Sequence, residues 1–194
     1  MPIVSHENLA ISDVILIRQR CFLDPRGYFA ESYCAPEYSK IGIDAAFLMD
    51  AQSGSTRRGT IRGLHFQAPP AAQAKLVRVL RGSIFDVAVD LRRGSPTYGR
   101  WCGSTITASG GEQLFIPVGF AHGFCTLEPD TEVAYKVDAV YSPADEGGIF
   151  WNDPDIGIPW PINAGDAFLS DKDAGLPYFR DFTSPFLYES RTHA

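Results

Sequence analysis

Short hydrophobic runs separated by turn residues constrain the fold of this chain more than any other feature. Strand-like runs fall at 76–80, 83–91, 100–107, 113–116, 122–127 and 131–137. Turn residues such as Arg81-Gly82 and Gly94-Ser95-Pro96 separate them. This spacing is typical of an all-β sandwich or barrel, and helix is scarce. The best helical candidate is 36–41, where Pro36 suits the first turn and Gly42 a C-terminal cap.

Alternation along the strands predicts which side chains point into the barrel. Tyr135 shares a face with Val133 and Val137, so we expect it to point inward, with Glu132 and Lys136 outward. The runs 76–80 and 83–91, joined by Arg81-Gly82, predict a hairpin. A barrel of two antiparallel sheets, widened at one mouth, could hold a ligand among such inward side chains.

Length and composition predict one domain. The 194 residues are 45% hydrophobic, which is enough for one substantial core. We expect a single domain over 1–194, with an N-terminal arm at about 1–30 and a C-terminal tail at about 161–194 packed on it. The cysteines Cys21, Cys34, Cys102 and Cys125 form no C-x-x-C pair, and we expect reduced, mostly buried thiols.

The charge balance limits the partners. A net charge of -6 and a pI near 5.1 argue against a nucleic acid or an anionic membrane as partner, because both select for basic surfaces. No stretch approaches about 18 consecutive apolar residues, and the N-terminus lacks the pattern of a signal peptide. We expect a cytoplasmic protein whose cationic groups, if the substrate is anionic, are concentrated in a pocket.

The stretch 62–67, with Lys75 on the next hydrophobic run, places a histidine between two cations. His65 has an ordinary pKa near neutrality, which suits proton transfer, and Arg62 and Lys75 suit an anionic substrate with a carbonyl group. Taken alone, a histidine between Leu64 and Phe66 is more often structural. Tyr135 alone is equally an ordinary strand tyrosine, and Asp86 fits either a site residue or an exposed carboxylate.

Several motifs occur together, in order, between about Asp24 and Asp173: 24–31, 62–67, 75–78, 85–92, 116–124, 135–136, 151–158 and 169–173. As a set they resemble the dTDP-4-dehydrorhamnose 3,5-epimerases. The resemblance implies a cupin-type jelly-roll barrel with a few short helices, usually a homodimer. It also implies a nucleotide-diphosphate sugar as substrate, with neither a metal nor an organic cofactor.

The resemblance also implies roles for particular residues. His65 is the base that removes protons beside the C4 ketone, and Asp173 orients it. Lys75 stabilises the enolate, and Tyr135 returns a proton from the opposite face. The implied substrate-binding residues are Arg26, Phe29, Glu31, Asp50, Gln52, Arg62, His122, Tyr141, Glu146 and Lys172.

The sequence departs from the family where the nucleotide base is read. Asp50 and Gln52 stand where members usually have a Gln-x-Asn pair. Because an ionised Asp only accepts hydrogen bonds, Asp50 suggests the hypothesis of a different base, linked through GDP or CDP.

Other functions stay open from the sequence alone. One is a single-position epimerase or a ketoisomerase on a related nucleotide sugar, because both need the same acid and base. A metal-dependent cupin would need a cluster such as His-x-His, which the chain lacks. A sugar-binding jelly roll without catalytic activity would have no reason to keep His65, Lys75 and Tyr135 together.

Overall fold

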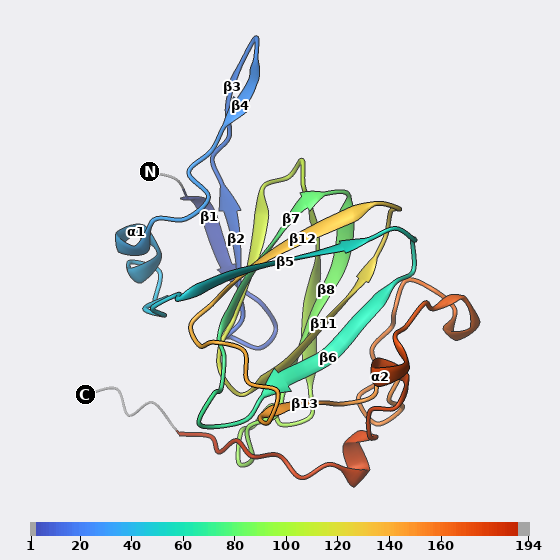
Figure 1. The fold of residues 1–194 in the computed structure, drawn as a ribbon. Helices are drawn as coiled ribbons and strands as arrows, with labels where there is room; N and C mark the ends of the chain where they lie inside the picture. Colours follow the sequence, from blue (N-terminus) through green and yellow to red (C-terminus); the bar gives the residue numbers. More distant parts are fainter. Residues whose placement is uncertain (1–2, 190–194) are drawn as a thin grey trace.

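The structure is a computed structural model that describes residues 3–189; the outer ends of the expected arm and tail, 1–2 and 190–194, lie outside these residues. Two antiparallel sheets face each other (Figure 1). The six-stranded sheet has the order β1 (Ile3–Asn8), β2 (Ile15–Gln19), β10 (Glu112–Ile116), β7 (Lys75–Arg81), β12 (Thr131–Val137) and β5 (Met49–Ser55). The five-stranded sheet has the order β13 (Glu146–Gly148), β6 (Ile61–Gln67), β11 (Phe120–Thr126), β8 (Ser83–Asp90) and β9 (Trp101–Thr107). The all-β jelly-roll prediction is confirmed.

The predicted hairpin between 76–80 and 83–91 is wrong, although both strands exist. The chain leaves β7 in one sheet and enters β8 in the other, where β8 pairs with β9 and β11. Gly82 makes this crossing with φ of +79°, and a Cβ there would lie 2.5 Å from Oγ1 of Thr131. A local turn signal cannot distinguish a hairpin from a turn that crosses between sheets.

The main core lies between the sheets and confirms the predicted inward face of β12. Val133 is 1% exposed, and Tyr135 packs against the same cluster as Ile84, Leu114 and Phe124. A second apolar cluster covers the other face of the five-stranded sheet, where Val87 and Val89 contact side chains that include Trp151 and Phe186. The C-terminal tail supplies much of this layer, so β8, an inner strand of the sheet, is buried on both faces.

Helices are few and short. α1 (Ala35–Ser39) coincides with the predicted segment and has a proline in its first turn. α2 (Asp171–Ala174) and the 3-10 turns η1 (Ala164–Asp166) and η2 (Phe179–Asp181) lie in the tail. No helix within 3–189 is long and apolar enough to cross a membrane. The four cysteines are free; Cys102 and Cys125 are buried as expected, whereas Cys21 is exposed.

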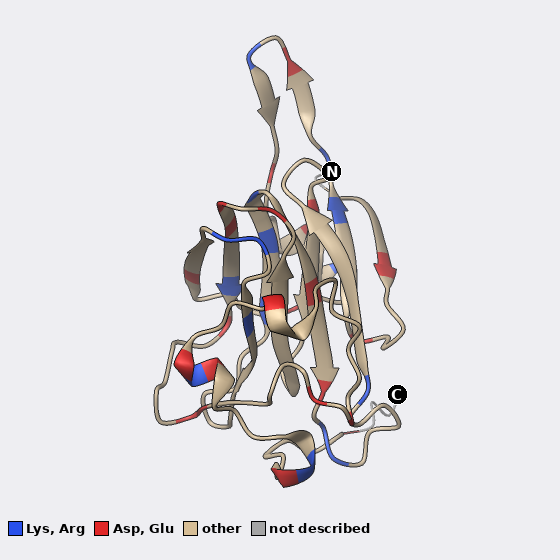
Figure 2. Ribbon diagram, turned by 90° about the vertical axis from the view of Figure 1, so that its right-hand side faces the viewer, with Lys and Arg blue, Asp and Glu red and all other residues tan. Residues whose placement is uncertain are grey.

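The hairpin of β3 (Phe22–Asp24) and β4 (Gly27–Phe29) extends away from the two sheets (Figure 1). Its apolar side chains are unusually open to solvent: Leu23 is 83% exposed, Tyr28 69% and Phe29 65%. A charged pair occupies the tip (Figure 2), where Arg26 Nη2 lies 2.6 Å from Asp24 Oδ2. Nothing within the described chain covers this apolar surface.

Candidate active site

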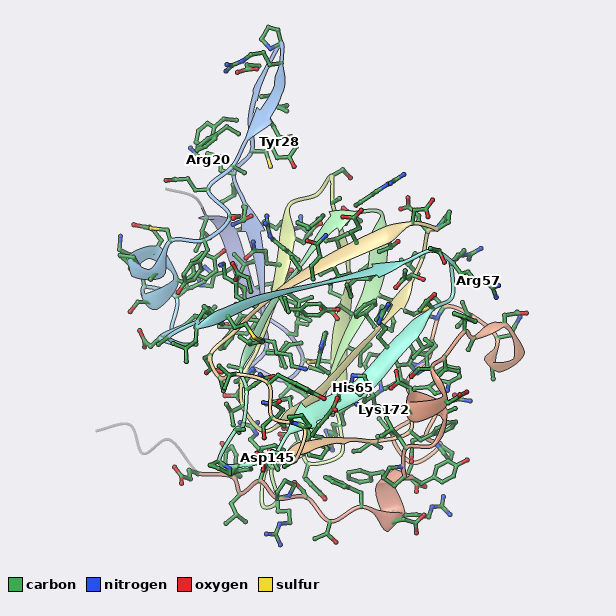
Figure 3. All side chains as sticks on the ribbon, viewed as in Figure 1. Arg20, Tyr28, Arg57, His65, Asp145 and Lys172 are labelled. Atoms are coloured by element: carbon green, nitrogen blue, oxygen red, sulfur yellow. The ribbon has the colours of Figure 1, made fainter. Side chains whose placement is uncertain are left out.

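A cavity of about 350 Å³ opens between the two sheets and collects most of the predicted site residues. His65, Arg62 and His122 come from the five-stranded sheet, and Lys75 and Tyr135 from the six-stranded sheet. Lys172 and Asp173 come from α2, beside β6, as the labelled His65 and Lys172 in Figure 3 illustrate. The remaining lining residues are Ser53, Phe124 and Ser170.

An irregularity in β6 brings both Arg62 and His65 to the cavity. Strict alternation would place residues three apart on opposite faces of a strand. The pairing with β11 shifts between His122↔His65 and Phe124↔Arg62, so β6 carries one extra residue. Gly63 lies in this stretch with φ of +124°, and a Cβ there would lie 2.6 Å from Cα of Gly123. Glycine at position 63 therefore permits the close strand contact that aims both side chains inward.

His65 forms a pair with Asp173 at the cavity wall. Its Nε2 lies 2.7 Å from Oδ1 of Asp173, while the backbone N–H of Gly63 donates to Oδ2 at 3.1 Å. Burial of Asp173 favours its neutral form. The hydrogen bonds to its carboxylate and the charge of His65 outweigh burial and hold the pKa of Asp173 below the usual range. An ionised Asp173 accepts the hydrogen of Nε2, which leaves the lone pair of Nδ1 available as a base.

Lys75 and Tyr135 lie on the opposite wall. Burial lowers the pKa of Lys75 to about 8, against the opposing influence of Asp86 and Glu146. Burial also raises the pKa of Tyr135, so the phenol keeps its proton at neutral pH. Its Oη lies 2.8 Å from Oγ of Ser53, which fixes the hydroxyl in place. The wall thus offers a cation and a proton donor facing a base.

A second histidine–carboxylate pair lies deeper. Nε2 of His122 is 2.6 Å from Oδ1 of Asp86, a fully buried side chain on β8. Burial lowers the pKa of His122 although Asp86 opposes that effect, so the ring is neutral at neutral pH. The ring of His122 meets the ring of Tyr135 edge-on, with centroids 6.2 Å apart.

Polar residues form the rim of the cavity. Arg62 donates to Oγ of Ser55 at 3.1 Å and to the carbonyl of Gly54 at 2.8 Å. Nζ of Lys172 lies 2.5 Å from Oε1 of Glu146. The hydroxyl of Tyr141 donates to the other oxygen of Glu146 at 2.7 Å. Lys172, Glu146 and Tyr141 are therefore linked to one another, whereas Arg62 is held by β5.

Glu146 and Tyr141 adjoin the cavity through Lys172 without lining it, and five further predicted binding residues lie away from the cavity of their own chain. Arg26 and Phe29 lie on the projecting hairpin and Glu31 just after it, because the hairpin turns away from the barrel (compare Tyr28 with His65 in Figure 3). Asp50 and Gln52 lie on the outer face of β5, since alternation turns them to the side opposite Ser53, which lines the cavity. There Asp50 pairs with Lys136 at 2.8 Å and Gln52 donates to Glu132 at 3.0 Å.

Sequence reasoning missed four contributors to the site. Ser53 and Ser170 carry no signal of their own, because serine is common in strands and turns. Phe124 reads as an ordinary core residue. Asp86 alone had a signal in the sequence, because it is a charged residue within an apolar strand. It is fully buried, which rules out the exposed carboxylate that the sequence also allowed. Within residues 3–189, no three His, Cys, Asp or Glu side chains gather as a metal ion requires.

Comparisons with known proteins identify the family of this chain. A family model described as dTDP-4-dehydrorhamnose 3,5-epimerase matches residues 8–181. A curated protein of that name from Sinorhizobium fredii is 51% identical over 155 residues, covering 80% of each chain. The crystal structure of a Bacillus anthracis dTDP-4-dehydrorhamnose 3,5-epimerase with TDP and PPi bound is 46% identical, with a TM-score of 0.85, over 90% of this chain and 99% of that one.

A second solved structure extends the likeness to a sugar complex. It is a dTDP-6-deoxy-D-glucose-3,5-epimerase from Legionella pneumophila in complex with dTDP-4-keto-L-rhamnose, 38% identical with a TM-score of 0.90. The match covers 95% of this chain and 99% of that one. With the family model spanning most of the sequence, the chain belongs to the dTDP-4-dehydrorhamnose 3,5-epimerase family and is an isomerase.

Proposed function

We propose that this protein inverts C3 and C5 of a dTDP-4-keto-6-deoxyhexose, converting dTDP-4-dehydro-6-deoxyglucose to dTDP-4-dehydrorhamnose without a cofactor. The observation that carries the proposal is the placement of His65 and Tyr135 on facing sheets around one cavity. A base and an acid on opposite sides of a sugar ring are what inversion of a carbon requires. The names of the relatives support the choice of sugar and nucleotide.

Proton removal is the first step. Nδ1 of His65 takes the proton from a carbon beside the C4 ketone, and the electron pair of the C–H bond moves to form an enolate on the ketone oxygen. Asp173 holds the ring and stabilises the imidazolium that results. Lys75 meets the negative charge that develops on the oxygen, and a fixed cation at that point lowers the barrier strongly.

Proton return completes the inversion. The phenol of Tyr135 gives its proton to the carbon from the opposite face, and the enolate electrons return to that carbon as the ketone reforms. Tyr135 becomes a phenolate and His65 keeps the first proton, so exchange with solvent must reset both groups before the next carbon reacts. If His65 returned its own proton, the starting configuration would reform.

The polar residues at the rim of the cavity are proposed to bind the substrate. Arg62 and Lys172 line the cavity of a protein whose net charge is -6, so positive charge is concentrated where a diphosphate would lie. Their recognition of phosphate oxygens follows from multiple N–H donors and full charge. We propose that His122 and Glu146 contact the substrate beside them, with Tyr141 stacking on the base.

The base is proposed to be thymine. The side chains of Asp50 and Gln52 point away from the cavity and are engaged with Lys136 and Glu132, so this geometry lends no support to Asp50 selecting another base. Calorimetry with TDP, GDP and CDP tests the point. Tightest binding of TDP supports the proposal, and preferential binding of GDP or CDP by the wild-type protein contradicts it.

Homodimerisation would give Arg26, Phe29 and Glu31 a place in a site. The projecting hairpin carries exposed apolar residues, and β1 is exposed along nearly its whole length, as expected for surfaces that a second copy covers. We propose that the hairpin of one subunit reaches the cavity of the other. Small-angle scattering tests the assembly: a dimer is expected, and a monomer at micromolar concentration would refute it.

Incubation with dTDP-4-dehydro-6-deoxyglucose in D2O, followed by NMR, tests the reaction. Deuterium is expected at both C3 and C5, together with the inverted sugar. Label at one carbon only would identify a single-position epimerase, and a moved carbonyl would identify a ketoisomerase. The same assay after metal removal by chelation is expected to give the same rate, whereas loss of activity that added metal restores would indicate a metal-dependent cupin.

A further inference from the structure

Asp86 combines complete burial with an incomplete set of hydrogen bonds. It lies on β8 with 0% of its side chain exposed, and Oδ1 is bonded to His122. Oδ2 is the one buried side-chain oxygen or nitrogen within residues 3–189 that has no hydrogen-bond partner. Buried carboxylate oxygens are nearly always bonded, so an unpartnered one calls for a reason other than folding.

Asp90 on the same strand shows what a structural carboxylate looks like here. It shares a face with Asp86 and is equally buried. Its oxygens accept hydrogen bonds from Arg92, Ser95 and Thr97 at 2.6–2.9 Å. β8 can therefore bury a carboxylate with a full set of partners, and the site around Asp86 lacks that set.

The surroundings of Asp86 are the reactive groups of the cavity. The charge of Asp86 raises the pKa of both Lys75 on β7 and Tyr135 on β12. His122 on β11 is hydrogen-bonded to Asp86. The other charged or titratable groups around Lys75 are His65 and Arg62 on β6, Glu146 on β13, and Lys172 and Asp173 on α2.

Lys75 makes no ion pair with any residue in the described chain. Two carboxylates favour its charged form, Asp86 more than Glu146. Glu146 already pairs with Lys172, and Asp173 with His65. Asp86 is therefore the buried carboxylate whose negative charge compensates the positive charge of Lys75. Since the two do not bond, the N–H donors of Lys75 remain available to a ligand.

We propose that Asp86 is a positioning residue that keeps Lys75 a cation in the empty cavity and holds His122 with its hydrogen on Nε2. The role of Lys75 rests on the function proposed above, in which this cation meets the enolate. Asp86 acts through its neighbours and does not touch the substrate. No donor bonds Oδ2, so hydrogen bonds offset less of the carboxylate charge than at Asp90, which strengthens its effect on Lys75.

The test is the pH dependence of deuterium exchange in Asp86→Asn. Asparagine keeps the size and can still accept from His122 but removes the charge. Without the charge of Asp86, burial lowers the pKa of Lys75 further. The pH at which the rate falls on the alkaline side of the profile, its alkaline limb, should therefore decrease by at least about one unit. Exchange at pH 8.5 should fall at least about eightfold relative to wild type, with a smaller loss at pH 6.5. An unmoved limb would overturn the proposal.

Asp90→Asn is the matched control, because it removes a buried charge from the same face of β8 away from the cavity. It should lower thermal stability without moving the limb. If Asp86→Asn does not fold, Asp86→Thr replaces it, since threonine suits a strand and its hydroxyl can accept from His122. A limb that moves equally in the Asp90 variant would show that lost stability, and not the charge of Asp86, is the cause.

A second measurement separates this proposal from the proposed function. Lys40, Lys75, Lys136 and Lys172 are the lysines of the chain, so 13C NMR of labelled lysine can follow each one. Lys75 should titrate at lower pH in Asp86→Asn than in wild type, even if no sugar exchanges. Absence of deuterium exchange by the wild type would contradict only the proposed epimerase function. An unchanged titration of Lys75 in Asp86→Asn would contradict only the proposed role of Asp86.

Discussion

Two histidine–carboxylate pairs line one cavity, and their bond lengths barely distinguish them. Nitrogen and oxygen are 2.7 Å apart in His65–Asp173 and 2.6 Å apart in His122–Asp86. The two histidines even face each other in the pairing of β6 with β11. They differ in exposure: the side chain of His65 is 28% exposed and that of His122 only 5%.

This difference in surroundings separates their chemistry. Asp173 receives a second hydrogen bond from Gly63 and lies on a short helix of the tail, at the wall of the cavity. Asp86 lies within the sheet, with one oxygen bonded and the other alone. The same pair of residue types can therefore move protons in one setting and hold charge in the other, as paired groups with divergent environments do in many enzymes. Each variant below is compared with wild type in the deuterium assay.

Lys75→Met removes the cation that both pairs surround, and it should have the largest effect. Loss of a group that stabilises a developing oxyanion typically slows reaction by about 100- to 1000-fold, and we expect the upper end because Lys75 carries full charge. Lys40→Met, on the exposed end of α1, should leave the rate unchanged. A loss below about tenfold for Lys75→Met would place the stabilising group elsewhere.

Asp173→Asn tests the more exposed pair. An amide can present its NH2 group to Nε2 and favour the wrong tautomer of His65, so exchange should slow by about 100-fold at pH 7.5. Asp171→Asn, two residues earlier on the same helix and exposed, should behave as wild type. An equal loss in both variants would point to damage to α2 and not to the chemistry of Asp173.

Tyr135→Phe separates proton removal from proton return. His65 remains, so deuterium exchange should stay within about tenfold of wild type, whereas net inversion should fall by about 100-fold because the acid on the opposite wall is gone. Product stereochemistry by NMR measures the second quantity. Tyr98→Phe, outside the cavity, is the control. Equal loss of exchange and inversion would contradict the two-wall mechanism.

Raising the pH tests the charge of Lys75 in the wild-type protein. Its pKa of about 8 lies below the ordinary value, so the cation is present below pH 8 and is lost above it. The rate of exchange should therefore fall by about eightfold between pH 7.5 and pH 9. A rate that stays constant to pH 10 would show that Lys75 remains charged or is not required.

Lys172→Ala at the rim should have the smallest effect. The lysine side chain is 55% exposed, and exposed ion pairs contribute little. We expect KM to rise by about fivefold with kcat nearly unchanged, since binding is affected more than chemistry. A large fall in kcat instead would assign Lys172 a part in orienting Asp173.

The strands were predictable because alternation and turn residues are local signals. The inward face of β12, and with it Tyr135, followed from period two alone. The crossing at Gly82 did not, because a turn between sheets and a hairpin turn look alike in sequence. The strands up to and including β6 were also missed, as was β13. Among them is edge strand β1, whose exposed residues carry no hydrophobic alternation.

The site was predictable in part, and through the set of motifs more than through single residues. His65, Lys75, Tyr135 and Asp173 do meet, although Asp173 comes from a tail helix that no periodicity indicated. Strict alternation would have turned Arg62 away from the cavity, and only the irregularity in β6 brings it back. The placement of Arg26 depends on the direction in which a hairpin projects, which the sequence does not encode locally, and Asp50 was misplaced because strand β5 itself was not predicted.

Deuterium incorporation in His65→Asn and His122→Asn, measured side by side with dTDP-4-dehydro-6-deoxyglucose in D2O, tests the division between the two pairs most directly. His65→Asn should incorporate no deuterium at C3 or C5, because the base is gone. His122→Asn should still incorporate it at both carbons, more slowly. Incorporation in His65→Asn, or its complete loss in a folded His122→Asn, would show that the buried pair moves the proton.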